Sequence, residues 1–190
     1  ADNSVTAKSK SLVEDYQYGL EQFVEEGRTL AKFKHPNIVR VTRYMRANGT
    51  AYLVMDYIEG CSLSDYLKTH GGDDEKFLTR LLRHLLCGLE LVHQQGFLHR
   101  DIKPGNIYIP NDGEPFLIDF GAARQALGEH SKSITGIVTA GYAPIEQYGL
   151  SANLTPACDL YALGATIYRI ILGAPPIDAT ERIRALQEKE

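Results

Sequence analysis

The leucine pattern between Glu75 and Gln94 constrains the fold of this chain more than any other feature of its sequence. Apolar side chains recur there at the spacing that places them on one face of a helix, and Gly96 follows as an end signal. These side chains are Leu78, Leu81, Leu82, Leu85, Leu86, Leu89 and Val92. The pattern predicts a long helix over residues 75–94 that buries one face in a core.

The octet HRDIKPGN, residues 99–106, follows this helix and gathers charged and amide side chains in a short loop. After it, the β-rich runs IYI and FLI flank the turn PNDGEP and predict a short hairpin. The hairpin leads to DFG at residues 119–121. Asp101, Lys103 and Asn106 are therefore expected on one loop and Asp119 on another, both at the ends of short paired strands.

These four side chains suit phosphoryl transfer. Asp and Asn oxygens are hard ligands that suit Mg²⁺, and a lysine near two carboxylates suits a phosphate whose charge must be neutralised. Asp101 would then accept the proton of a hydroxyl group. Positioning and charge neutralisation do most of the catalysis in phosphoryl transfer, so the cluster meets the requirement of that reaction.

Before these loops the sequence predicts a helix, a hairpin and a second helix. Helical spacing begins near Tyr18 and ends before Pro36, which disfavours helical geometry at His35. The runs NIVRVTRYMR and AYLVMDYI are joined through Asn48-Gly49, a pair that suits a tight turn. Residues 1–11 are predicted to form a loop, and the polar link EGCS precedes a small helix over LSDYLKTH.

After DFG, residues 122–140 are small and polar without a period, which predicts a long loop. A last, buried helix is predicted to begin at Thr155-Pro156, because threonine suits the N-cap and proline the first helical position. Gly173 marks its end.

Composition narrows the class of protein and its partners. The chain has 190 residues, 44% hydrophobic and 23% charged, which is an ordinary globular mix. Acidic and basic residues are interleaved at a net charge of −4, so nucleic acid is not an expected partner. The three cysteines lack CxxC spacing, which favours neither a disulfide framework nor zinc and fits a cytoplasmic location. No membrane segment is expected, because Arg169 and nearby Gly and Pro break the most apolar stretch.

These motifs resemble those of the eukaryotic-type protein kinases, most of all the eukaryotic-like Ser/Thr kinases of bacteria. HRDIKPGN resembles the catalytic loop, and DFG resembles the magnesium-binding motif. GYAPIEQY resembles the segment that closes the activation loop, with Glu146 at its glutamate, although APIE carries one residue more than the usual A-P-E. Asp159 resembles the aspartate that opens the central helix, and FVEEGRTLAKFKHPNIVRV resembles the regulatory helix with the strand after it.

The resemblance implies roles for the catalytic residues. Asp101 would orient or deprotonate the substrate hydroxyl, and Lys103 would stabilise the transferring phosphoryl group. Asn106 and Asp119 would hold Mg²⁺, with Mn²⁺ as a substitute. Thr139 matches the threonine that contacts the catalytic aspartate and lysine in Ser/Thr kinases.

It also implies a nucleotide site and a switch. Met55 would be the gatekeeper, with the backbone of Asp56 and Ile58 facing adenine and Tyr108 beneath it. Glu26 stands where the glutamate that pairs with the ATP-binding lysine is expected. Arg100 would pair with a phosphate on Ser131, Ser133 or Thr135. Leu30, Val41, His99 and Phe120 match the stacked column that links the two lobes of the family's fold.

The sequence also departs from the family. No glycine-rich loop and no V-A-I-K lysine precede Glu26, and the last helices of the large lobe are not expected either. The domain is thus expected to be truncated at both ends. Residues 1–57 would form a remnant of the small lobe, made of a linker, the regulatory helix and the hairpin, and residues 58–190 the large lobe.

The expected fold is α+β with two lobes, a partial small lobe and a mostly helical large lobe. The expected function is a protein Ser/Thr kinase that transfers the γ-phosphoryl group of ATP to protein hydroxyls. Two alternatives stay open, a naturally truncated, non-catalytic binding or regulatory module, and a kinase whose missing strands come from another chain. Apolar surfaces left open by the missing parts predict self-association or a partner chain.

Overall fold

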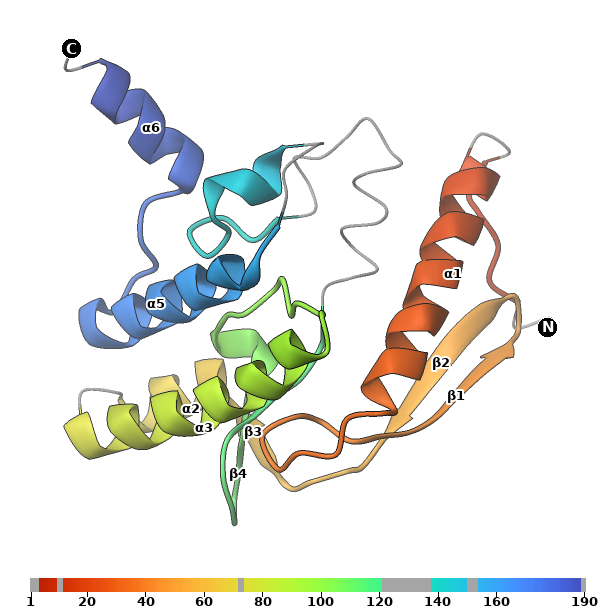
Figure 1. The fold of residues 1–190 in the computed structure, drawn as a ribbon, viewed down its shortest axis with the longest axis horizontal. Helices are drawn as coiled ribbons and strands as arrows, with labels where there is room; N and C mark the ends of the chain where they lie inside the picture. Colours follow the sequence, from red (N-terminus) through yellow and green to blue (C-terminus); the bar gives the residue numbers. More distant parts are fainter. Residues whose placement is uncertain (1–3, 10–11, 72–73, 121–137, 150–153, 189–190) are drawn as a thin grey trace.

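The computed structural model describes residues 4–9, 12–71, 74–120, 138–149 and 154–188. The elements form two groups (Figure 1), and the expected α+β architecture with two lobes is confirmed. The first group packs α1 (Val13–Leu30) against the hairpin of β1 (Val41–Ala47) and β2 (Thr50–Met55). The second, mostly helical group contains β3 (Gly60–Ser62), α2 (Leu63–His70), α3 (Glu75–Gln94), η2 (Pro104–Asn106), β4 (Ile107–Pro110), β5 (Phe116–Leu117), η4 (Ile145–Tyr148), α5 (Pro156–Leu172) and α6 (Ala179–Gln187).

Helix α1 is present as predicted, but its predicted start near Tyr18 is wrong because the helix begins at Val13. Glu14 and Asp15 lie in its first turn, where the helix dipole favours negative charge. The Tyr16 hydroxyl also donates to the carbonyl of Gly49 at 2.8 Å, which ties the first turn to the hairpin. The spacing of apolar residues, from which the start was predicted, reveals neither the favourable charges of the first turn nor the hydrogen bond of Tyr16.

The β1–β2 hairpin has the predicted turn. Asn48 and Gly49 have φ angles of 54° and 71°, as a tight turn of this kind requires, and Ala47 pairs with Thr50 across it. The backbone N–H of Val5 donates to the carbonyl of Asn48 at 2.7 Å, so the N-terminal loop lies against this turn.

A three-stranded antiparallel sheet, ordered β3-β4-β5, was only partly predicted. The β4–β5 pairing was expected, whereas EGCS was expected to be a polar link and instead contains β3, which pairs Cys61 with Ile109. A strand of three residues is too short to show an alternating pattern. Val39 N–H donates to the carbonyl of Leu117 at 2.9 Å, which joins the chain after α1 to this sheet.

Helix α3 has the predicted bounds and provides the centre of the core. Its Leu81, Leu85, Leu89 and Val92 are at most 1% exposed. One connected cluster of buried apolar side chains extends from Leu30 of α1 through the second sheet and α3 to α5.

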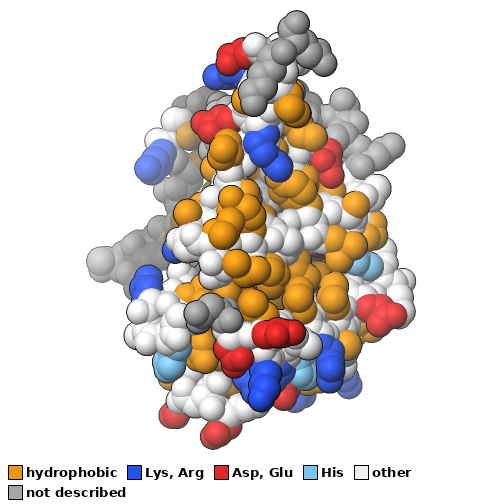
Figure 2. Space-filling view, turned by 90° about the vertical axis from the view of Figure 1, so that its left-hand side faces the viewer, with side chains coloured by type: hydrophobic (Ala, Val, Ile, Leu, Met, Phe, Trp, Pro, Cys, Tyr) orange, Lys and Arg blue, Asp and Glu red, His pale blue; other side chains and the backbone are white. Residues whose placement is uncertain are grey.

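Helix α5 has the bounds that Thr155-Pro156 and Gly173 predicted, and Gly173 adopts a φ of 78°. It was predicted to be the last helix, which is wrong, and to be buried, which holds for the face that carries Cys158, Asp159, Ala162 and Thr166. Helix α6 follows, capped by Asp178, and residues at the end of α5 are exposed, with Ile171 at 58% and Leu172 at 59%. Hydrophobic side chains gather on the side of the molecule where α5 ends (Figure 2). Within the described ranges, every helix is too short or too polar to span a bilayer.

Candidate active site

The octet after α3 is held by a carboxylate at the start of α5. Asp159 is fully buried and accepts hydrogen bonds from the backbone N–H of His99 at 2.9 Å and of Arg100 at 2.8 Å. His93 Nε2 lies 2.8 Å from the same carboxylate. Burial raises the pKa of Asp159, but its contacts with His93, His99 and Arg100 outweigh this and hold the pKa below its usual value. The start of α5 thus fixes the backbone of the loop.

Arg100 and Asp119 have positive φ angles of 69° and 59°, a conformation that non-glycine residues seldom adopt. Backbone hydrogen bonds at or next to each residue hold these conformations. Asp159 accepts from the N–H groups of the consecutive residues His99 and Arg100, and the Asn106 carbonyl accepts from Ile118 N–H at 3.0 Å, directly before Asp119. Such conformations concentrate at functional sites, where the surrounding structure maintains the strain.

His99 connects the octet with the segment before Asp119. Its Nδ1 accepts from the Asp101 N–H at 3.3 Å, so Nε2 carries the proton that is donated to the Ile118 carbonyl at 3.1 Å. Burial lowers the pKa of this ring. The ring packs on Phe120 with centroids 4.4 Å apart, and Leu30, Val41 and Phe120 of the expected column are all buried.

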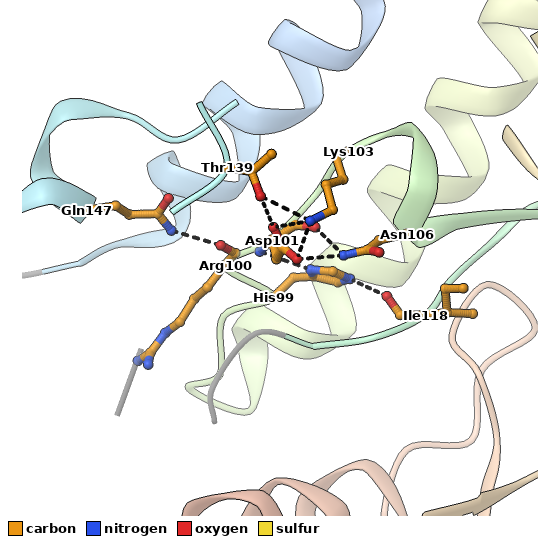
Figure 3. A network of polar contacts seen from close by, with 8 residues as sticks. All are labelled: His99, Arg100, Asp101, Lys103, Asn106, Ile118, Thr139 and Gln147. Atoms are coloured by element: carbon orange, nitrogen blue, oxygen red, sulfur yellow. Dashed lines mark hydrogen bonds and ion pairs between the residues drawn. The ribbon is translucent and has the colours of Figure 1, made fainter. Parts of the chain in front are cut away.

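Asp101 is at the centre of a dense polar cluster (Figure 3). Its Oδ1 accepts from Thr139 Oγ1 at 2.7 Å and from Lys103 Nζ at 3.0 Å, and its Oδ2 accepts from Lys103 Nζ and Asn106 Nδ2, both at 2.8 Å. Lys103 Nζ also donates to Thr139 Oγ1 at 3.0 Å. Asp101 is only 8% exposed, so these donors hold its carboxylate in a buried environment. The structure thus brings together Asp101, Lys103, Asn106 and Thr139 as the sequence predicted.

The predicted nucleotide-binding residues also meet. Glu26, Met55, Asp56, Ile58 and Tyr108 line one cavity of about 600 Å³ together with Asp119. The remaining wall is mostly apolar and includes Phe23, Leu30, Val39, Leu53, Phe116, Ile118 and Phe120. The Tyr108 hydroxyl donates to the carbonyl of Ile58 at 3.0 Å, which fixes the floor of the cavity to the segment after β2. The cavity has the size and apolar character of a small-molecule site.

The side chains of Asp119, which lines this cavity, and of Asn106, whose backbone carbonyl binds the lining residue Ile118, fit a hard divalent cation. The two Nδ2 contacts of Asn106 go to Asp101, which leaves its amide oxygen to act as a ligand, and Asp119 offers an exposed carboxylate. Among the described residues no three His, Cys, Asp or Glu side chains converge on a metal site. A cation held by Asn106 and Asp119 would therefore need phosphate and water oxygens to complete its coordination, the usual pattern for Mg²⁺.

Of the residues predicted to form the switch, the structure describes Arg100 but not its expected partners. Ser131, Ser133, Thr135 and Gly121 of DFG lie outside the described residues. The carbonyl of Arg100 accepts from Gln147 Nε2 at 3.1 Å.

The segment GYAPIEQY, residues 141–148, also contacts α5. Glu146 accepts from Cys158 Sγ at 3.3 Å, and burial raises the pKa of this thiol.

No sequence pattern indicated a role for His93 or Gln147. His93 contacts Asp159 across 66 positions and Gln147 contacts Arg100 across 47, so no local spacing could have indicated either contact. The cavity residues Val39 and Phe116 were missed for the same reason, since the packing of the two groups of elements decides which side chains line the cavity.

The chain matches the family model described as protein kinase domain over residues 2–189. It is 32% identical over 170 residues to the probable serine/threonine-protein kinase zyg-1 of Caenorhabditis briggsae, covering 87% of this chain and 24% of that protein. It is 38% identical over 157 residues to the serine/threonine-protein kinase PknK of Mycobacterium bovis, covering 81% of this chain and 14% of that protein. The chain thus spans less than a quarter of the length of these relatives. Among solved structures, the apo form of PpkA-294 superimposes with a TM-score of 0.83 at 37% identity, over 94% of this chain and 63% of the other.

Proposed function

Because the chain belongs to the protein kinase domain family, we propose that it forms part of a protein Ser/Thr kinase that transfers the γ-phosphoryl group of ATP to protein hydroxyls. The observation that carries this proposal is the cluster of Asp101, Lys103, Asn106 and Thr139 beside the cavity that Asp119 lines. Bacterial Ser/Thr kinases are among the relatives, in agreement with the resemblance of the motifs.

In this proposal Asp101 orients the substrate hydroxyl and accepts its proton. Three donors hold the carboxylate, so it needs little reorganisation before reaction. Lys103 provides positive charge beside the transferring group, where negative charge must be stabilised. The contact of Thr139 with both residues supports a Ser/Thr rather than a Tyr acceptor.

ATP is the proposed nucleotide, with adenine between the segment after β2 and Tyr108. The backbone of Asp56 and Ile58 would contact the base, Met55 would close the rear of the cavity, and Glu26 would face the phosphates with a cationic partner. Asn106 and Asp119 are the proposed ligands for Mg²⁺ or Mn²⁺. When bound, such a cation neutralises charge on the phosphate oxygens.

Regulation is proposed to act through Arg100. A phosphate on Ser131, Ser133 or Thr135 would supply its anionic partner. The Nε atom of Arg100 is buried and makes no hydrogen bond to the described residues, which supports the need for such a partner.

The proposed division places residues 1–57 in the small lobe and residues 58–190 in the large lobe. A protein substrate and ATP are the proposed partners, and exposed apolar side chains such as Ile171 and Leu172 support self-association or a covering chain. The proposed location is the cytoplasm, which supplies ATP and keeps thiols such as Cys61, Cys87 and Cys158 reduced.

Calorimetric titration of the 190-residue chain with ATP, with and without Mg²⁺, tests the nucleotide site. We expect Mg²⁺-dependent binding that Asp119→Asn abolishes. Asp112→Asn, an exposed aspartate in the β4–β5 turn, is the matched control and should bind as the unmodified chain does. Equal binding by the Asp119→Asn variant would exclude Asp119 as a ligand. No binding in any protein would favour the non-catalytic alternative for this chain, and phosphotransfer would then need a further segment or partner.

A further inference from the structure

The carboxylate of Asp178 joins three parts of the chain. Asp178 directly precedes α6, and its Oδ1 accepts from the backbone N–H of Thr180 at 2.9 Å and from the Thr180 hydroxyl at 2.6 Å. Its Oδ2 accepts a short hydrogen bond from the hydroxyl of Tyr148 in η4. The backbone N–H of Gly141 donates to the same carboxylate. One side chain thus caps α6 and binds both ends of the segment 141–148.

The loop that carries Asp178 lies close against Gly141. A Cβ atom at Gly141 would lie 2.7 Å from the Pro176 carbonyl oxygen and 3.2 Å from Pro175 Cβ, and the φ of +81° also requires glycine. The backbone at Gly141 therefore packs closely against the 175–178 loop, and no side chain would fit between them. A shift of the 175–178 loop toward Gly141 would therefore displace the turn that contains Gly141.

This turn begins at Thr139, which contacts the catalytic loop. The N–H groups of Tyr142 and Ala143 donate to the Thr139 carbonyl at 3.1 and 3.0 Å, and the Thr139 hydroxyl donates to Asp101. At the other end of the segment, Gln147 donates to the Arg100 carbonyl. Asp178 therefore reaches the catalytic loop by two routes, through Gly141 to Thr139 and through Tyr148 to Gln147.

The electrostatics keep this carboxylate ionised. Burial raises the pKa of Asp178, but the hydrogen bonds from Thr180, Tyr148 and Gly141 outweigh burial and lower the pKa to about 2. Burial and the contact with Asp178 raise the pKa of Tyr148, so the phenol stays protonated and donates at neutral pH.

We infer that Asp178 is a positioning residue, which anchors the segment from Thr139 to Tyr148 against the catalytic loop and thereby sets the affinity for the hydroxyl-bearing protein substrate. The inference rests on the function proposed above, because that function makes Thr139 a neighbour of the reacting hydroxyl. The anchor also links α6 to the site. A change in how α6 is held would therefore alter substrate affinity without any contact between α6 and ATP.

Two conservative variants test the anchor. Tyr148→Phe removes one hydroxyl, and Asp178→Asn keeps an acceptable N-cap for α6 while removing the charge. Hydrogen exchange at the Tyr142 and Ala143 amides reports the turn directly and requires no enzymatic activity. We expect each variant to speed exchange there about tenfold, the effect of one lost hydrogen bond on local opening, and the double variant to add little. Exchange in α3 should not change.

The control is Asp112→Asn, which removes a carboxylate far from this segment and should alter neither exchange nor kinetics. For phosphotransfer, we expect the KM for the protein substrate to rise about tenfold while the KM for ATP stays constant. Unchanged exchange at Tyr142 and Ala143, or an equal increase in α3, would overturn the anchor. Faster exchange at the turn alone in a chain that transfers no phosphoryl group would support the anchor, and the proposed phosphotransfer would then fail for this chain by itself.

Discussion

The Thr139 hydroxyl donates a hydrogen bond of 2.7 Å to Asp101 Oδ1, although 38 positions separate the two residues in the chain. Lys103 lies within 3.0 Å of both partners, so the three side chains form a closed triangle. The turn that begins at Thr139 is thereby fixed to the loop that carries the proposed base. A substrate segment bound at this turn would have its hydroxyl close to Asp101.

Replacement of Thr139 by valine tests this relationship, because valine keeps the branched shape and removes the hydroxyl. We expect the phosphotransfer rate at saturating ATP to fall about 10²-fold, since Asp101 and Lys103 lose a common partner. Thr139→Ser should retain most of the rate. A valine variant with the unmodified rate constant would mean that the contact has no role in catalysis.

Replacement of Asp159 by asparagine should destabilise the fold. The buried carboxylate accepts from two backbone N–H groups and contacts His93, and an amide nitrogen in its place would face one of these donors. We expect a loss of about 3 kcal/mol in the free energy of unfolding, measured by denaturant titration. Asp112→Asn should change it by less than about 0.5 kcal/mol. Similar losses in the two variants would contradict the proposed role of Asp159.

Stability should depend on the protonation of His99. Burial lowers the pKa of His99 in the folded chain below the value of 6.5 expected when unfolded. The unfolded chain therefore binds a proton that the folded chain excludes, so the free energy of unfolding is complete above pH 6.5 and falls as the pH drops below it.

Thermal unfolding between pH 7.5 and 5.5 measures this effect. His99→Phe keeps a ring against Phe120 and should flatten the dependence of Tm on pH, although it lowers Tm at every pH by removing the bonds to Asp101 and Ile118. His70→Gln replaces an exposed histidine and should leave the slope as it is. A slope that persists in His99→Phe would assign the titration to another group.

Two helical glycines should respond oppositely to alanine. A Cβ at Gly88 of α3 would lie 2.9 Å from the Asn37 carbonyl oxygen, whereas a Cβ at Gly164 of α5 would meet nothing within 4 Å. Gly164→Ala should stabilise the chain by about 0.5–1 kcal/mol through helix propensity. Gly88→Ala should destabilise it by about 1–2 kcal/mol, because the backbone of Asn37 must move. Denaturant titration of both variants checks the signs, and stabilisation by Gly88→Ala would show that α3 and this loop are not in close contact.

The exposed apolar side chains of α5 and α6 should promote association. Ile171, Leu172 and Leu186 are 58%, 59% and 67% exposed. We expect sedimentation to show oligomers of the 190-residue chain and thermal scans to show weak cooperativity. Leu172→Glu should shift the distribution toward monomer, whereas Glu181→Gln on α6 should not. A monodisperse monomer with a cooperative transition would contradict the prediction.

Elements whose signals are local could be predicted from neighbouring residues in the sequence. The leucine face of α3, the Asn48-Gly49 turn and the Thr155-Pro156 start of α5 each depend on neighbouring residues, and the structure confirms all three. The motifs HRDIKPGN and DFG likewise predict Asp101, Lys103, Asn106 and Asp119 as candidate site residues from the sequence alone.

Contacts between residues far apart in the sequence depend on how the whole chain packs. Strand β3 forms because β4 provides its partner, and α6 begins where Asp178 caps it while also binding Tyr148. The contacts of His93 with Asp159 and of Gln147 with Arg100 join residues without any common spacing. Local propensity acts over a few residues, whereas hydrogen bonds and burial depend on distance in space, so these contacts become visible only after the chain has packed.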